Sequence, residues 1–174
     1  MKNFKYILIS SIIIYCLTIG AHFLFDIFQS DIIAVFFNTN ESIFQHMKMV
    51  FTCFIIFYLI LFMVRRKFDF HNVFLTSLIA SISCILFFLI VYIPVNSIFG
   101  ENMVFTFIWL FISIFFGQYI SYSFLKKEDN RTSEIISLII VFIIFIISGY
   151  LTYYPIENFL FWDPQHKTYG IVLK

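Results

Sequence analysis

Two short stretches of this 174-residue chain carry histidines and acids in patterns that could do chemistry. His22 and Asp26 are one helical turn apart, so their side chains can hydrogen-bond or share a ligand. The segment NESIFQH, residues 40–46, adds Glu41 and His46 directly before MKMVFTCFIIFYLILFMV, which is almost pure hydrocarbon. Imidazole and carboxylate groups are common zinc ligands. The same side chains also suit a purely structural hydrogen-bonded cluster, so both interpretations stay open.

Local helix geometry limits what NESIFQH does alone. Asn40 is a favourable N-cap residue, and Glu41 in a first turn would suit the positive end of the helix dipole. A helix that starts there points Glu41 and His46 about 140° apart. We therefore expect the two not to ligate one ion, unless the helix starts later or unwinds. His46 is expected to meet His22 or Asp26 across a helix pair.

The composition indicates an integral membrane protein. The chain is 61% hydrophobic and only 12% charged, whereas soluble domains carry about 25% charged residues. The net charge of +1 gives no electrostatic case for nucleic acid as a partner. The three cysteines lie within apolar runs without zinc-type spacing, and we expect buried, hydrophobic roles for them: Cys16, Cys53 and Cys84.

Five apolar stretches are long enough, or nearly so, to cross a bilayer as helices, because a span needs about 20 residues. The predicted fold is therefore all-α, a polytopic transmembrane helical bundle in a single membrane domain. The only charge in the second span is Lys48, which is expected to snorkel toward the surface. The run at 32–37 is too short to span and is expected to be re-entrant or interfacial. The predicted spans are 7–25, 47–64, 73–93, 103–125 and 135–154, followed by an outer tail at 155–174.

The basic residues favour one orientation in the cell membrane. If the five spans alternate, eight of the 11 Lys and Arg residues fall on one side. The positive-inside rule then places the N-terminus in the cytoplasm and the C-terminus outside. The outer end of the first span, the NESIFQH segment and the tail with Asp163 would share the outer side. Separate segments can then converge on one site.

Polar and small residues recur at helical spacing within the spans. Six polar residues of the first span form one stripe, which should face the bundle interior: Ser11, Tyr15, Thr18, His22, Asp26 and Gln29. Small residues at intervals of four predict close helix packing in the fourth span: Ser113, Gly117 and Ser121.

Three motifs together resemble a known but uncharacterised family. HFLFD (22–26), NESIFQHMK (40–48) and YYPIENFLFWDPQHKTYGI (153–171) resemble small multipass membrane proteins of Gram-positive bacteria, clostridia especially. Members of that family read approximately HF-x-YD, NES-V-W-E-H-x-K and DP-x-x-x-TYGI. The resemblance implies a multipass membrane protein and supplies no activity. Gln45 stands where the family has Glu. His166 stands where the family pattern has no His, so His166 is discounted as a ligand. The matching residues are His22, Asp26, Asn40, Glu41, Ser42, His46, Lys48, Asp163, Pro164, Tyr169 and Gly170.

Three functions remain open from the sequence. The polar cluster is structural or ligand-binding in a membrane protein of unknown function, or it belongs to a metal-dependent membrane hydrolase. Alternatively, the chain is a subunit of a transporter or channel. Five spans are few for a transporter, so that function requires a homo-oligomer or another membrane-protein partner. The candidate cluster is His22, Asp26, Asn40, Glu41, Ser42, His46, Asp163 and Tyr169, and the candidates for a divalent metal are His22, Asp26, His46 and Asp163.

Overall fold

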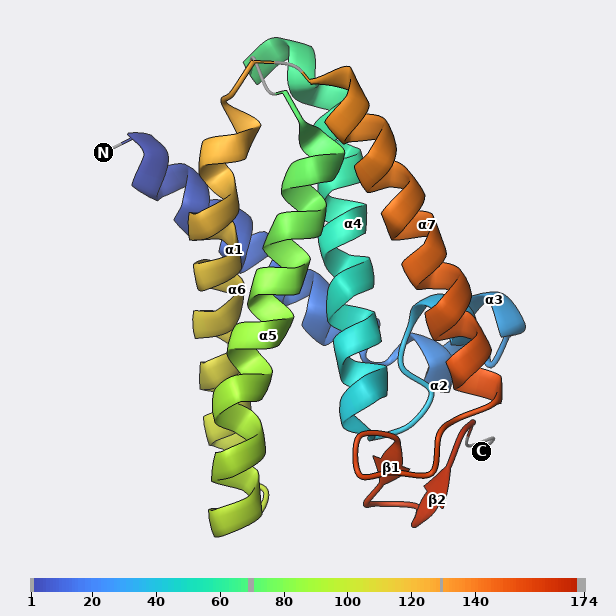
Figure 1. The fold of residues 1–174 in the computed structure, drawn as a ribbon. Helices are drawn as coiled ribbons and strands as arrows, with labels where there is room; N and C mark the ends of the chain where they lie inside the picture. Colours follow the sequence, from blue (N-terminus) through green and yellow to red (C-terminus); the bar gives the residue numbers. More distant parts are fainter. Residues whose placement is uncertain (1, 69–70, 129, 172–174) are drawn as a thin grey trace.

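The chain is a bundle of helices, seen in a computed structural model that describes residues 2–68, 71–128 and 130–171 (Figure 1). The predicted all-α fold is confirmed. The last three residues of the predicted tail lie outside the described residues. The elements are α1 (Lys2–Ala21), α2 (Leu24–Phe28), α3 (Asp31–Phe36), α4 (Ile43–Phe68), α5 (Val73–Phe99), α6 (Met103–Leu125), α7 (Arg131–Tyr153), β1 (Trp162–Asp163) and β2 (Thr168–Tyr169).

Within the described residues, five helices are long and apolar enough to cross a membrane, as predicted. Their candidate spans are Phe4–Ala21, Ile43–Val64, Val73–Phe99, Met103–Leu125 and Arg131–Tyr153. The beginnings of α1, α5 and α7 and the ends of α4 and α6 lie toward one end of the bundle (Figure 1). The other end holds α2, α3, the α5–α6 connection and the β1–β2 hairpin. The order of the connections therefore matches the predicted alternation, and which end faces outward stays a prediction.

Close packing of α5 against α6 follows the predicted pattern of small residues. Ser113 and Ser121 are fully buried, and a Cβ on Gly117 would collide with the backbone oxygen of Ala80. Cys53 and Cys84 are buried as expected. Cys16 is exposed on α1, so its predicted burial was wrong.

The first span is shorter than its hydropathy suggested. α1 ends at Ala21, and the bond from Phe23 N–H to Gly20 O, 3.4 Å, tightens its last turn. The predicted polar stripe is therefore broken. Its first part faces the bundle interior, where Thr18 is buried, whereas Asp26 sits exposed on the separate short helix α2.

The short helix α3 is held against α4 by polar side chains. Lys48 Nζ donates to Ala34 O at 2.6 Å and to Thr152 Oγ1 at 2.8 Å, and Thr52 Oγ1 donates to Phe36 O at 2.6 Å. The last carbonyls of a helix lack partners within it, and a cation is favoured at that end. Lys48 is only 5% exposed, so the expectation that it snorkels was wrong. α3 is too short to span, as predicted, and its depth in the membrane stays a prediction.

Gly117→Ala should lower the free energy of unfolding by about 1–3 kcal/mol, because the added methyl group meets rigid backbone at Ala80. The matched control is Gly20→Ala, which meets no atom within 4 Å and should be neutral or slightly stabilising. Thermal unfolding of the two variants in detergent compares them. Equal melting temperatures would contradict the packing described for α5 and α6.

Candidate metal centre

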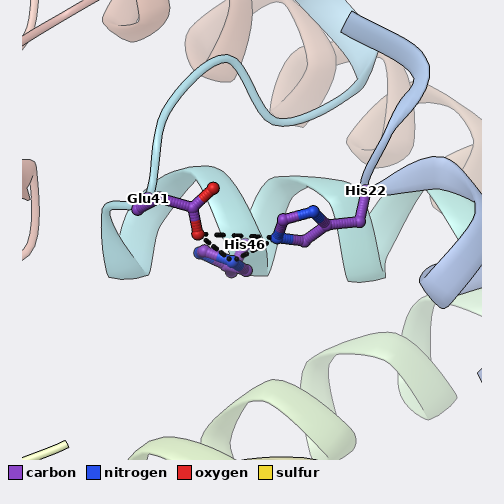
Figure 2. A group of neighbouring side chains, drawn as sticks. All are labelled: His22, Glu41 and His46. Atoms are coloured by element: carbon purple, nitrogen blue, oxygen red, sulfur yellow. Dashed lines mark hydrogen bonds and ion pairs between the residues drawn. The ribbon is translucent and has the colours of Figure 1, made fainter. Parts of the chain in front are cut away.

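Three side chains from separate segments meet at the start of α4 (Figure 2). His22 follows the end of α1, Glu41 lies in the loop before α4, and His46 is on the first turns of α4. His22 Nε2 lies 3.1 Å from His46 Nε2. Glu41 Oε2 lies 3.5 Å from His22 Nε2 and 3.4 Å from His46 Nε2. One ligand atom from each residue is thus close enough to the other two to share an ion.

The spacing of these atoms fits a tetrahedral ion. Zinc binds nitrogen and oxygen ligands at about 2.0–2.1 Å, so two ligands of a tetrahedral site lie about 3.3 Å apart. Octahedral coordination at the same bond length requires about 2.9 Å. The three separations, 3.1, 3.4 and 3.5 Å, all exceed the octahedral value and bracket the tetrahedral one. The cluster therefore matches three corners of a tetrahedron, and no fourth His, Cys, Asp or Glu joins it among the residues that the structure describes.

A backbone contact fixes the protonation of His46. Its Nδ1 lies 2.9 Å from the carbonyl oxygen of Ser42, which can only accept a hydrogen bond. Nδ1 therefore carries a proton, and Nε2 is the ring nitrogen that faces His22 and Glu41. Metal-binding histidines commonly donate their second ring N–H to a backbone carbonyl in this way.

The electrostatics of the cluster keep Glu41 ionised. Hydrogen bonds from His22 and, to a smaller extent, from His46 hold the pKa of the Glu41 carboxyl well below its usual range. The ionised form is the one that ligates a metal. The three side chains remain between 27% and 30% exposed, so the cluster is accessible from outside the protein. Closed zinc sites with four protein ligands are structural, whereas sites with three ligands and an open position are catalytic.

Ser42, not Asn40, caps α4. Its Oγ accepts from Gln45 N–H at 3.3 Å, and the helix begins at Ile43. Asn40 instead folds the preceding loop, because its Oδ1 accepts from Ser42 N–H at 2.9 Å. The expectation that Glu41 and His46 point apart was therefore wrong, since it assumed a helix through Glu41. The two side chains were expected to meet only if the helix starts later, and the observed start at Ile43 is such a later start.

The C-terminal tail, residues 155–171, supports the loop that carries Glu41. Asp163 is fully buried, and its Oδ2 accepts from the backbone N–H of Glu41 at 3.3 Å and from His166 Nδ1 at 2.8 Å. Asn40 Nδ2 donates to Gly170 O at 2.6 Å, and Phe44 N–H donates to Leu160 O at 2.9 Å. The tail thus bonds on both sides of Glu41, to the loop at Asn40 and to the first turn of α4 at Phe44.

Comparison with known proteins places the chain in a family. The model of a family of unknown function, DUF6512, matches residues 1–171. The chain belongs to this family. No curated protein and no solved structure matches it significantly. Membership in DUF6512 agrees with the expected resemblance to a family without assigned activity, and it covers almost the whole chain.

In this DUF6512 member, some candidate residues meet in the group of three and others lie around it. The meeting of His22 with His46 is as predicted, and Glu41 joins them although a helix through Glu41 was expected to turn it away from His46. Asp26 is exposed on α2 and supplies no atom to the group of three. Asp163 contacts the Glu41 backbone rather than the imidazoles.

Other candidate residues lie around the cluster without entering it. Tyr169 packs its ring against Trp162 within the hairpin, with centroids 5.1 Å apart. His166 contacts Asp163 and stays outside the group of three ligand atoms. An apolar groove of about 230 Å³ between α4, α5 and α7 is separate, since none of its lining residues belongs to the cluster.

Asp163→Asn should lower the free energy of unfolding by about 2 kcal/mol. The amide presents N–H groups where the carboxylate accepts hydrogen bonds, and bonds to a buried charge are strong. The matched control is Glu157→Gln on the exposed part of the same tail, which should leave stability unchanged. Thermal unfolding in detergent measures both, and an unaltered melting temperature for Asp163→Asn would show that the tail does not hold the loop.

Proposed function

We propose that this membrane protein binds one divalent ion of the zinc class through His22, Glu41 and His46, and uses the open position to activate water for hydrolysis. The observation that carries the proposal is the separation of the three ligand atoms, 3.1–3.5 Å, which suits a single tetrahedral ion. Partial exposure of all three side chains supports access by water and substrate.

The contacts that hold the tail favour an ion over a structural latch. The tail is already held by Asp163 and Asn40, so the latch does not require the histidines.

The donor set suits hydrolytic chemistry. Two neutral imidazoles and one carboxylate leave a net positive charge on a divalent ion. Zinc in such a site lowers the pKa of bound water to about 7 and polarises a carbonyl oxygen. His46, oriented by Ser42, and Glu41, oriented by Asp163, would keep the ion in place while the fourth ligand exchanges.

The transporter function receives no comparable support. A path through the bundle would require solvated polar side chains below the cluster. Ser11 and Thr18 are buried, and their hydroxyls bond to carbonyls of their own helix, Ile7 O and Ile14 O.

The proposed location is the cell membrane, with the cluster on the outer side. Its support is the distribution of charge, since eight of 11 basic residues fall on the opposite side if the five helices span. The cluster lies at the end of the bundle that also holds the tail (Figure 1).

Protein purified through a tag without histidines and loaded with zinc should retain about one ion per chain by elemental analysis. His22→Ala and His46→Ala should each abolish stoichiometric retention, and Glu41→Gln should weaken affinity by at least about 10–100-fold. His71→Ala is the matched control, because His71 lies at the other end of α4, outside the cluster, and its loss should leave the ion bound. Folded wild-type protein without an ion, or folded His22→Ala and His46→Ala variants that both keep theirs, would refute the proposal.

A further inference from the structure

We infer that the substrate of the His22–Glu41–His46 site is the acyl bond of a membrane lipid. This inference rests on the proposed metal-dependent hydrolysis and adds the class of molecule that is cleaved. Its independent support is the depth of the site in the membrane and the apolar surface beside it.

The depth follows from the length of α5. Its 27 residues extend about 40 Å, close to the thickness of a bilayer with its headgroup layers, about 40–45 Å. The α5–α6 hairpin continues past the start of α4, where the cluster lies (Figure 1). The tip of the hairpin would then lie within the outer headgroup layer, and the cluster would lie deeper than the tip.

The side chains at the hairpin tip agree with contact with lipid. Apolar residues on both sides of the α5–α6 connection are largely exposed: Ile98 72%, Phe99 80%, Met103 72% and Val104 68%. Large apolar side chains exposed together are typical of a membrane-contacting surface. The start of α4 lies deeper than the hairpin tip. If lipid reaches the residues at the tip, the start of α4 lies within the boundary between headgroups and acyl chains.

The segment next to His22 also presents an apolar surface. Phe23 is 54% exposed, and its ring packs edge-to-face on His22 with centroids 5.3 Å apart. Farther along α2 and α3, Ile27 is 67% and Ile32 is 73% exposed. A half-open polar cluster bordered by such residues suits a molecule with a polar linkage and a long hydrocarbon chain.

The reaction balances with water alone. His22, Glu41 and His46 would hold the ion, which would lower the pKa of a bound water and polarise the ester carbonyl. The oxygen of that water would bond to the carbonyl carbon, and the bond from that carbon to the leaving oxygen would break. One proton of the water would pass to the leaving alkoxide, so one ester and one water give a carboxylic acid and an alcohol. No atom is oxidised or reduced. Acyl linkages of glycerolipids lie between headgroup and chains, at the depth inferred for the cluster.

Catalysis tests the substrate class directly. Zinc-loaded protein is reconstituted in vesicles of phosphatidylglycerol and phosphatidylethanolamine, and released fatty acid is measured by mass spectrometry. The same preparation is assayed on p-nitrophenyl acetate, a water-soluble ester. We expect fatty-acid release that falls at least about 100-fold in His46→Ala and Glu41→Gln, with little cluster-dependent cleavage of the soluble ester.

The results separate this inference from the proposed function. Loss of zinc binding would remove both. Zinc-loaded protein that cleaves p-nitrophenyl acetate in a cluster-dependent way but leaves the lipids intact would overturn only the lipid inference. Zinc-loaded protein that cleaves neither substrate would overturn the lipid inference and leave the metal site standing.

The depth has a readout that needs no activity. Phe23→Trp, in a chain whose Trp109 and Trp162 are replaced by Phe, should be quenched by phospholipids brominated on the acyl chain near the headgroup. The matched lipid-facing control is Phe142→Trp on α7, where Phe142 is 66% exposed. Quenching at position 142 without quenching at position 23 would place the site in water and overturn the inference.

Discussion

The candidate site depends on where α4 begins. A helix that started at Glu41 would turn its carboxylate away from His46, whereas a helix that starts at Ile43 leaves Glu41 on a loop that reaches both histidines. That start is set by the Ser42 cap and by the tail, through the bond from Glu41 N–H to Asp163. The arrangement of the three side chains is therefore tied to a contact between residues 122 positions apart.

Elsewhere in the bundle, polar groups follow the rule that lipid cannot solvate them. Lys48 is bonded to a carbonyl of α3 and to the Thr152 hydroxyl, and Gln45 Nε2 donates to the same hydroxyl at 3.4 Å. These bonds join α3, α4 and α7 without exposing a charge. The cluster of His22, Glu41 and His46 differs, since its three facing atoms come from separate segments and the side chains that carry them remain partly exposed. That contrast is the reason to propose a ligand there.

The sequence predicted the fold well wherever the membrane dictates which residue types occur at which spacing. Hydrophobic runs predicted five helices, and the spacing of Ser113, Gly117 and Ser121 predicted a close helix pair. Alternation of loops predicted that His22, His46 and Asp163 lie at the same end of the bundle. All of these follow from local composition or from counting spans.

The details of the site depend on tertiary contacts that local patterns do not encode. Asn40 is a good cap by type, yet it bonds to Gly170, 130 residues away, and leaves the capping to Ser42. Lys48 near a span end is expected to reach for water, yet α3 folds back and offers it a carbonyl. α1 stops at Ala21 although the apolar run continues to Phe25. In each case a distant segment or a backbone turn decided between two locally acceptable conformations.

The most direct measurement is X-ray absorption at the zinc edge of the purified, zinc-loaded protein. We expect a first shell of nitrogen and oxygen atoms only, at about 2.0–2.1 Å, with the scattering pattern of two imidazoles. A first shell with sulfur at about 2.3 Å would assign the ion to the cysteines and contradict the site at His22, Glu41 and His46.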